Sequence, residues 1–336
     1  MSNTKKKHHY VPRFLLRQFS ENKTHLWAYD KTTGKSHGSP IMDLGSENRF
    51  YSIPDKFLTK PGNNEFVEDI YEDIDTRSSK SLFEFLQNIK SAALLSPSGF
   101  PKYFIPDHLM HELGWLAVIQ TVRTKEFREF STQTKMLFQK AIFDWFLDSD
   151  QIKKISGKSK PELKITIEEG GEALEHSRAA FDEQLLNKLH DHCLNKIWTI
   201  GINNTNKPLL ISDNPVVMTS HLGKPLAWGA KGTEVALPVS PNHLLIWTCP
   251  LALTQEVADN YDRRPFELHS DHIDYYNSLQ TLQSTRYIYS ARDDFSFCSD
   301  LLHDNESAFR DPLRSRAQIN IGGDEYTVPR NYKNGI

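Results

Sequence analysis

Two adjacent histidines near the start of the chain, His8 and His9, are the first side chains that could do chemistry. Neighbouring side chains point in different directions on most backbones. One imidazole could therefore ligate a metal or act as a general base while the other holds a phosphate. The plainer alternative is a solvated pair beside the three lysines Lys5 to Lys7. The pair is a candidate catalytic element, with that alternative left open.

Two carboxylates, Glu68 and Asp213, are the candidate metal ligands and further candidate catalytic groups. Glu68 lies in NNEFVEDIYEDID, between the apolar and acidic faces of a predicted helix, and could share a divalent ion with Glu72 four residues later. Asp213 ends the apolar run of LLISDNPVV, where a strand end offers a rigid and open position. The alternatives are a solvated helix face for Glu68 and an Asx-turn for Asp213.

Arg123, Asn214 and Asn277 are candidates for binding a substrate or its phosphate. If Arg123 in QTVRTKEF points inward, its guanidinium could clamp a phosphate through two hydrogen bonds; if it points outward, it pairs with a nearby glutamate. Asn214 could position a phosphate or a carbonyl. Asn277, on a predicted late helix, is either a helix cap or a site residue. The patterns GxxxxGK[ST], GxGxxG, HExxH and GxSxG are absent, so a P-loop or a serine hydrolase has no sequence support.

Composition restricts the class of protein. With 38% hydrophobic and 25% charged residues, the chain can bury a core and is not a disordered protein. A net charge of −3 is unlike that of a nucleic-acid coat protein, although a local basic patch is compatible with it. Three widely spaced cysteines argue for a reducing compartment and against a disulfide framework or structural zinc. Without an apolar run of 18 residues or a signal peptide, we expect no membrane association and a cytoplasmic location.

The elements that must position these side chains can be predicted from hydrophobic spacing. A short helix at 12–19, a hairpin at 24–38 and a short strand at 48–54 come first. Helical spacing then marks the segments 64–90, 107–148 and 172–193, with a polar loop at 150–163. In the helix at 107–148, Leu109, Leu113, Leu116 and Ile119 begin the apolar stripe, and Phe138, Ile142, Trp145 and Phe146 finish it. The later strands are KIWTIGIN, KPLLISD, EVALPVS and NHLLIWTC, followed by a helix at 268–284 and a strand at 286–291.

This order predicts an α+β fold with a short N-terminal β piece, a central block of long helices and a C-terminal antiparallel or mixed sheet. We expect one domain over residues 1–300, with a helical part at about 64–193 and a β-rich part at about 196–291. A polar C-terminal tail is expected at 301–336. The length of the helix at 107–148 exceeds what a small core needs, which favours a homo-oligomer.

The opening segment KKHHYVPRFLLRQF resembles the hallmark of a family of proteins of unknown function, DUF4238. Further pieces are similar to that family in the same order over roughly 6–291: LWAYDKTTGK, NRFYSI, the acidic helix with Glu68, QTVRT, LLISDNPVV, ALPVSPNHLLIW and YYNSLQTLQSTRYIYS. One departure is Lys125, where a proline is expected after the threonine of QTVRT. The resemblance implies a cytoplasmic protein of bacteria or their mobile elements and, for some members, anti-phage defence. It draws attention to His8, His9, Arg123, Asp213, Asn214 and Asn277.

Two functions from different classes follow. In the first, the protein is an anti-phage effector that cuts nucleic acid or a nucleotide with Mg²⁺ or Mn²⁺ held by Glu68 and Asp213, while His8 and His9 assist the chemistry. In the second, it is a non-catalytic sensor or binding module for a phage component, a nucleotide or RNA. Its His9, Arg123 and Asp213 then form a buried polar network that holds elements together. A third interpretation treats HHYVP only as an arm docked on the core.

Overall fold

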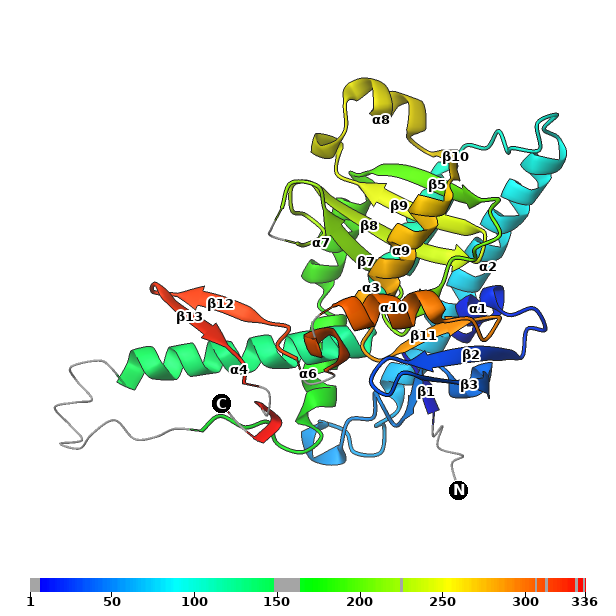
Figure 1. The fold of residues 1–336 in the computed structure, drawn as a ribbon. Helices are drawn as coiled ribbons and strands as arrows, with labels where there is room; N and C mark the ends of the chain where they lie inside the picture. The colour runs from blue at the N-terminus through cyan, green and yellow to red at the C-terminus, as the bar shows by residue number, and fades with distance from the viewer. Residues whose placement is uncertain are drawn as a thin grey trace.

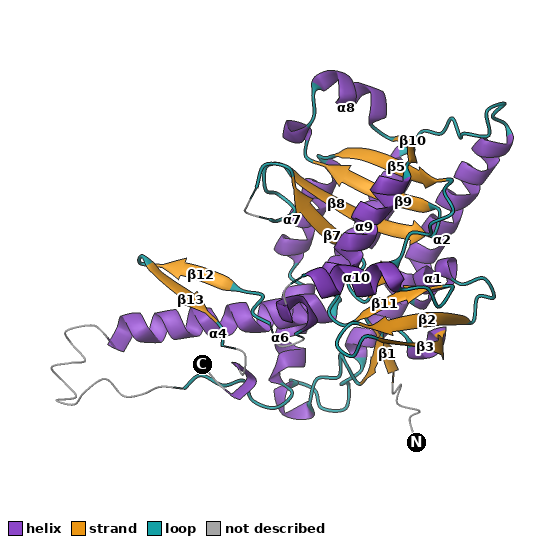
Figure 2. Ribbon diagram, viewed as in Figure 1, coloured by secondary structure: helices purple, strands orange, loops and turns teal. Residues whose placement is uncertain are grey.

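Strands lie at both ends of the chain and helices lie between them, so the predicted α+β fold is confirmed (Figures 1 and 2). The computed structural model describes residues 7–147, 164–223, 226–305, 307–311, 314–329, 332–334 and 336. The loop predicted at 150–163 and the lysines Lys5 and Lys6 lie outside these residues.

A mixed five-stranded sheet forms the larger β layer, in the order β10-β5-β9-β8-β7. Its strands are β5 (Ile197–Asn203), β7 (Val217–Ser220), β8 (Thr233–Ser240), β9 (His243–Thr248) and β10 (Arg264–Leu268). Only β10 pairs in parallel, with β5.

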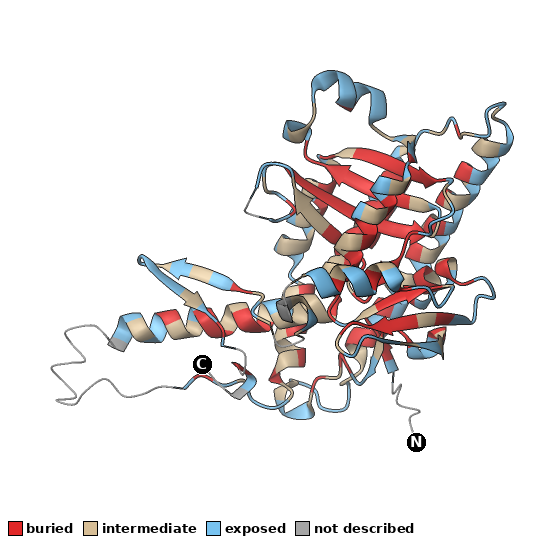
Figure 3. Cartoon of the chain, viewed as in Figure 1, coloured by how far each residue is buried: buried red, intermediate tan, exposed pale blue. Residues whose placement is uncertain are grey.

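The central strands of this sheet are buried on both faces (Figure 3). Alternate residues therefore belong to two different hydrophobic clusters: Leu245 and Trp247 face the helices of the main core, whereas Leu244 and Ile246 pack with residues of α9 (Ser270–Gln283). The sheet is thus covered by helices on both sides.

A second, antiparallel sheet has the order β3-β2-β11-β6. The predicted N-terminal hairpin, β2 (His25–Asp30) and β3 (Lys35–Pro40), pairs with the late strand β11 (Tyr287–Ser290), and β11 pairs with β6 (Ile211–Ser212). This sheet brings the first 40 residues beside the SDNP segment, which follows them by about 170 positions in the chain.

A separate two-stranded pair contains the histidines. In it, β1 (Lys7–His9) pairs with β4 (Ser46–Asn48). The strand predicted at 48–54 is wrong beyond Asn48: the chain turns at Arg49, whose φ of 53° ends the extended backbone.

Nine helices cover the sheets in the described part of the chain. They are α1 (Arg13–Leu16), continued by a 3₁₀ turn to Phe19, α2 (Phe66–Leu94), α3 (Asp107–Val122), α4 (Lys125–Leu147), α6 (Gly171–Ala180), α7 (Glu183–Leu194), α8 (Gln255–Tyr261), α9 and α10 (Ser296–Asp304).

The prediction of one helix over 107–148 is wrong, because the chain breaks between α3 and α4. Tyr51 Oη donates a hydrogen bond to the carbonyl oxygen of Arg123 at 2.7 Å. Thr124 Oγ1 accepts the backbone N–H of Phe127, which caps the start of α4. The segment predicted as one helix at 172–193 divides in the same way, where Asp182 caps α7 by accepting the N–H of Leu185.

The segment predicted as a polar tail contains a hairpin, β12 (Gln318–Ile321) and β13 (Asp324–Thr327), which packs along α4. The residues that flank the hairpin, Ala317, Val328 and Tyr332, form a hydrophobic cluster with Met136 and Leu137 of the helix. None of the described helices is long and apolar enough to cross a membrane.

Candidate functional site: two buried polar networks

His8 is completely buried, and both of its ring nitrogens face protein groups. The backbone N–H of Tyr51 donates to Nδ1 at 2.9 Å, and Nε2 lies 2.6 Å from Oε2 of Glu65. Because Nδ1 accepts a hydrogen bond, the proton of the neutral ring is on Nε2 and points at the carboxylate. The ring also stacks on that of Tyr51, with 5.9 Å between centroids. The predicted catalytic histidine therefore joins the N-terminal strand to two later segments.

His9, Glu68 and Arg123 lie together, in a first network completed by Asp75 of α2. Arg123 reaches both carboxylate oxygens of Asp75 and also donates to the carbonyl oxygen of His9. Glu68 accepts the backbone N–H of His9. The main chain of His9 is thus held on both sides, and its side chain is held by the carbonyl oxygen of Met42, 3.2 Å from Nε2. We call His8, His9, Glu68, Asp75 and Arg123 the His–Arg network.

Burial shifts the titration of two groups in the His–Arg network. The pKa of His9 falls to about 4, chiefly because burial disfavours the charged ring and secondly because Arg13 repels it. The pKa of Glu68 rises to about 8, again chiefly through burial, although Arg123 opposes the shift. Oε2 of Glu68 has no hydrogen-bond partner among the described residues. Both side chains are therefore neutral around pH 7.

Asp213 is fully buried and lies in a second network. Its carboxylate accepts three consecutive backbone N–H groups, from Thr285 at 2.7 Å, Arg286 at 2.8 Å and Tyr287 at 2.9 Å. Burial raises the pKa of Asp213, and the three donors oppose that rise by stabilising the charged form. Asp213 therefore fastens the end of β6 to the start of β11.

Three amide side chains on one face of α9 continue this second network. Asn277 accepts the N–H of Leu210 and donates to the carbonyl of Pro208. Gln280 bonds the main chain at Ser212 and Pro215, and Gln283 bonds the main chain of Met218 twice.

Because β6 is the edge strand of its sheet, its outer backbone groups have no strand partner, and the amide of Gln280 takes that place at Ser212. Asn277 bonds the residues before β6, and Gln283 bonds Met218 in β7, the edge strand of the five-stranded sheet. Asn214 adds a bond from Nδ2 to the carbonyl of Gln283. We call Asp213, Asn214, Asn277, Gln280 and Gln283 the Asp213 clasp.

Gly45 links the segment that follows β1 to the strand β11. The carbonyl of Gly45 accepts the N–H groups of Tyr10 and Val11, and its own N–H donates to Tyr289 Oη on β11. Gly45 has φ +56°, and a Cβ there would lie 2.7 Å from Cβ of Val11, so only glycine fits.

Glu68 and Asp213, the predicted metal pair, belong to different networks. Among the residues described, no group of three or more His, Cys, Asp or Glu side chains is placed to hold a metal ion.

Three important residues of these networks are not among the candidates predicted from the sequence: Asp75, Gln280 and Gln283. The signal for the two glutamines was present in YYNSLQTLQ, where Asn277, Gln280 and Gln283 recur every third residue and so lie close together on a helix. Asp75 had no comparable signal, because its partner Arg123 lies 48 positions later.

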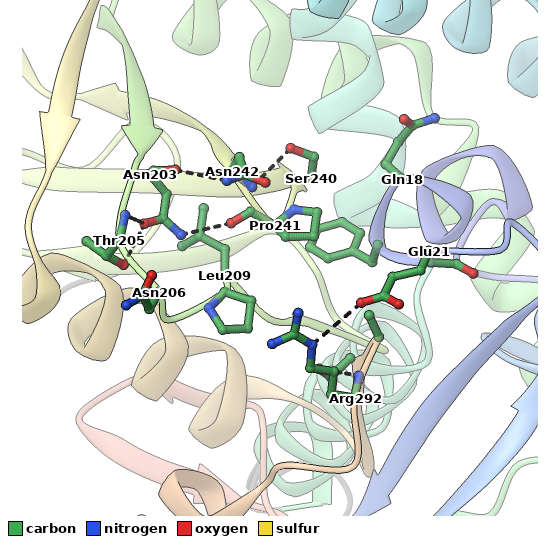
Figure 4. A pocket seen from close by; sticks show the side chains of 15 residues that line it. Gln18, Glu21, Asn203, Thr205, Asn206, Leu209, Ser240, Pro241, Asn242 and Arg292 are labelled. Carbon is green, nitrogen blue, oxygen red and sulfur yellow. Dashed lines mark hydrogen bonds and ion pairs between the residues drawn. The ribbon is translucent and has the colours of Figure 1, made fainter. Parts of the chain in front are cut away.

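Two of the cavities among the described residues lie outside the His–Arg network. One, of about 370 Å³, lies between the 3₁₀ turn after α1, the end of β5 and the end of β11 (Figure 4). Its polar walls are largely bonded to one another: Asn203 bonds Thr205 and the carbonyl of Pro241, and Asn242 bonds the carbonyl of Asn203. These contacts leave few free groups for a ligand.

The other cavity, of about 570 Å³, adjoins the Asp213 clasp, and Asn214 and Gln283 line it. Side chains from α4, α7, β7 and the C-terminal segment complete its wall. Its volume is in the range of small-molecule sites, and most of its lining is apolar. We call it the α4–α7 cavity.

The comparison with known proteins agrees with the resemblance to the DUF4238 family. No curated protein and no solved structure matches the chain. A family described as "Protein of unknown function (DUF4238)" matches residues 7–294, which include β1, both polar networks and β11 but end before α10 and the C-terminal hairpin. The chain is therefore a member of the DUF4238 family.

Proposed function

We propose that this protein is a cytoplasmic anti-phage defence protein that acts as a non-catalytic sensor or binding module. The defence role follows from the family resemblance. One observation supports its non-catalytic character: the carboxylate of Asp213 accepts hydrogen bonds from three main-chain N–H groups. A carboxylate in that position holds the fold together and has little capacity left for a metal or a reacting proton.

The same reasoning applies to the HHYVP segment. Both nitrogens of His8 face protein partners, and the main chain of His9 is held by Glu68 and Arg123. A general base needs a free nitrogen within reach of a substrate proton, which His8 lacks. The alternative, a metal-dependent nuclease that uses Mg²⁺ or Mn²⁺, would need ligands that the two separate networks do not bring together. The partner that we propose is a phage component, a nucleotide or RNA.

A second copy of the chain is a further proposed partner, because the far end of α4 exposes large apolar side chains. Those with the largest exposed fractions are Phe138 (47%), Ile142 (60%), Phe143 (45%), Trp145 (76%) and Phe146 (53%). The predicted stripe thus faces outward, while Met136, Leu137 and Ala141 face the protein.

The exposed side chains of this α4 face amount to roughly 550 Å², taking about 200 Å² for each large side chain. That approaches the roughly 800 Å² per partner of a stable interface. Figure 1 shows α4 extending away from the two sheets, where a second α4 could pack beside it. The spacing i, i+4, i+7, i+8 suits helix-to-helix packing.

The test separates catalysis from binding. Purified protein is incubated with cellular RNA and DNA, with and without Mg²⁺ or Mn²⁺, and a host that expresses the protein is challenged with phage. We expect no degradation of nucleic acid by the folded protein. We also expect His9→Ala to reduce protection only as far as it reduces the amount of folded protein.

The matched control is Leu15→Ala, which removes a fully buried apolar side chain from the same N-terminal segment. If the histidine is structural, the two variants lose protection in proportion to their loss of stability. Metal-dependent degradation that disappears in a fully folded His9→Ala protein would overturn the proposal and establish the nuclease function.

A further inference from the structure

The α4–α7 cavity has one apolar side and one charged side. The apolar side is built by aromatic and aliphatic residues of four segments, among them Phe127, Phe130, Leu185, Leu189 and Trp228. Such walls favour a flat, apolar body. Most of the lining residues lie within the family match, but Phe309, Arg314, Ser315 and Arg316 come from the C-terminal segment beyond it.

The charged side carries a net positive charge. Among the described residues that line the cavity, three are charged: Glu126, Arg314 and Arg316. The two arginines share the single carboxylate, with Nη2 of Arg314 2.9 Å from Oε1 and Nε of Arg316 3.0 Å from Oε2. Since arginine stays protonated in proteins, one positive charge is left over. The buried amine of Lys31 also interacts electrostatically with both arginines.

Two hydrogen-bond donors of the lining residues have no acceptor among the described residues: Nη1 of Arg314 on the charged side and Nε1 of Trp228 on the apolar side. Both atoms are buried, and a buried donor without a partner is unfavourable. A ligand that brings acceptor oxygens to the charged side of the cavity would, with a small side-chain rotation, satisfy Nη1 of Arg314. A planar guanidinium is well matched to the oxygens of a phosphate.

We propose that the α4–α7 cavity binds a small aromatic phosphate, with the ring system against Phe127, Phe130 and Trp228 and the phosphate beside Arg314 and Arg316. This inference rests on the proposed function, since it names a ligand class for a non-catalytic module. It also gives a role to the C-terminal segment, which supplies the cationic side of a cavity whose apolar side belongs to the family domain.

The test is calorimetric titration of the full-length protein with four probes: 1-naphthyl phosphate, 1-naphthol, inorganic phosphate and adenosine monophosphate. 1-Naphthyl phosphate should bind at least about tenfold more tightly than either 1-naphthol or inorganic phosphate, because both sides of the cavity then contribute to its affinity. Comparable binding of adenosine monophosphate would identify nucleotides as the source of the ligand. Its failure, with naphthyl phosphate bound, would leave a non-nucleotide aromatic phosphate.

Substitutions on each side of the cavity test the contributions of the two sides separately. Arg314→Gln should weaken 1-naphthyl phosphate about tenfold or more, by loss of a charge-assisted hydrogen bond, and leave 1-naphthol unchanged. Phe130→Ala, at a half-exposed position that tolerates truncation, should weaken both aromatic probes by roughly tenfold. Arg310→Gln, an exposed arginine of the same C-terminal segment, is the matched control and should bind like the wild type.

Equal affinities of 1-naphthyl phosphate for the wild type and Arg314→Gln would overturn the inference, as would the absence of binding. Neither result touches the proposed function, which is read from nucleic-acid degradation and phage protection. Conversely, conversion of 1-naphthyl phosphate to fluorescent 1-naphthol would overturn the non-catalytic proposal while leaving the binding site in place.

Discussion

Replacing the buried Glu68 with glutamine should stabilise the protein at pH 8, whereas most substitutions of buried residues destabilise. Glu68 is 4% exposed, and burial raises the pKa of its carboxyl from 4.5 to about 8. The folded protein therefore holds this proton more tightly than the unfolded chain does. Its stabilising contribution is complete below the unfolded pKa and is lost as the pH rises through about 8. Glutamine stays neutral at every pH and avoids that loss.

The magnitude follows from the pKa change. At about 1.4 kcal/mol per pH unit, a pKa moved from 4.5 to about 8 corresponds to at most about 5 kcal/mol. Between pH 5 and pH 8 the free energy of unfolding of the wild type should fall by roughly 3 to 4 kcal/mol relative to Glu68→Gln. The low pKa of His9 has the opposite effect, with stability lost as the pH falls from 6.5 towards 4. It is common to both proteins and cancels in the comparison.

The measurement is urea unfolding of both proteins at pH 5 and pH 8. With a slope of about 3 kcal/mol per molar urea, the difference between the two midpoints should change by about 1 M. Asp73→Asn, at an exposed carboxylate on the same helix, is the matched control and should stay within about 0.5 kcal/mol of the wild type at both pH values. A difference between wild type and Glu68→Gln that is the same at pH 5 and pH 8 would refute the reasoning.

Three further predictions concern the clasp, Gly45 and α4. Asp213→Asn places an amide N–H₂ against backbone donors and should lower the free energy of unfolding in urea by about 2 to 4 kcal/mol. The control Asp271→Asn, at an exposed position on α9, should be neutral. Equal stabilities of the two variants would contradict the clasp. Gly45→Ala should lower the free energy of unfolding by about 1 to 3 kcal/mol more than Gly323→Ala does. Both glycines have positive φ, but only at Gly45 would the new Cβ meet a neighbouring Cβ. Equal losses of stability would leave backbone strain as the whole effect. Trp145→Asp should convert a dimer to a monomer in light scattering, while Phe83→Asp, at another exposed aromatic on α2, should not; a monomeric wild type would exclude the α4 interface.

The longer helices, the hairpin β2–β3 and the strands β5, β8, β9 and β11 could be predicted because hydrophobic spacing is a local property of the chain. Shorter elements, among them β1, β7, β10, α8 and α10, were not predicted. The breaks after Val122 and after Ala180 were missed, although Thr124 and Asp182 are residue types that cap helices. The helical spacing of apolar residues continues across both breaks, because apolar residues are present on each side of each break. The cause of the first break includes a bond from Tyr51, which lies 72 positions away, and no local pattern reports that contact.

The residue types of the site could also be predicted, but their partners could not. The expected residues divide into His8, His9, Glu68 and Arg123 in one network, and Asp213, Asn214 and Asn277 in the other. A sequence identifies an imidazole or a carboxylate. Whether main-chain donors already occupy that group depends on how distant segments pack, and at Asp213 those donors favour a structural role.

Polar residues at these positions solve a problem that apolar residues cannot. The segment around β6 runs along the edge of a sheet inside the protein, where water does not reach its backbone groups. Each buried N–H or C=O left unpaired would cost about 1 to 3 kcal/mol. The amides of α9 satisfy these groups only when Asn277 meets Leu210 and Gln280 meets Ser212, so a shift by one residue would break several bonds together. The clasp therefore sets the register of β6 as well as stabilising it. Because Asn214 and Gln283 also line the α4–α7 cavity, the same register positions that part of the cavity wall.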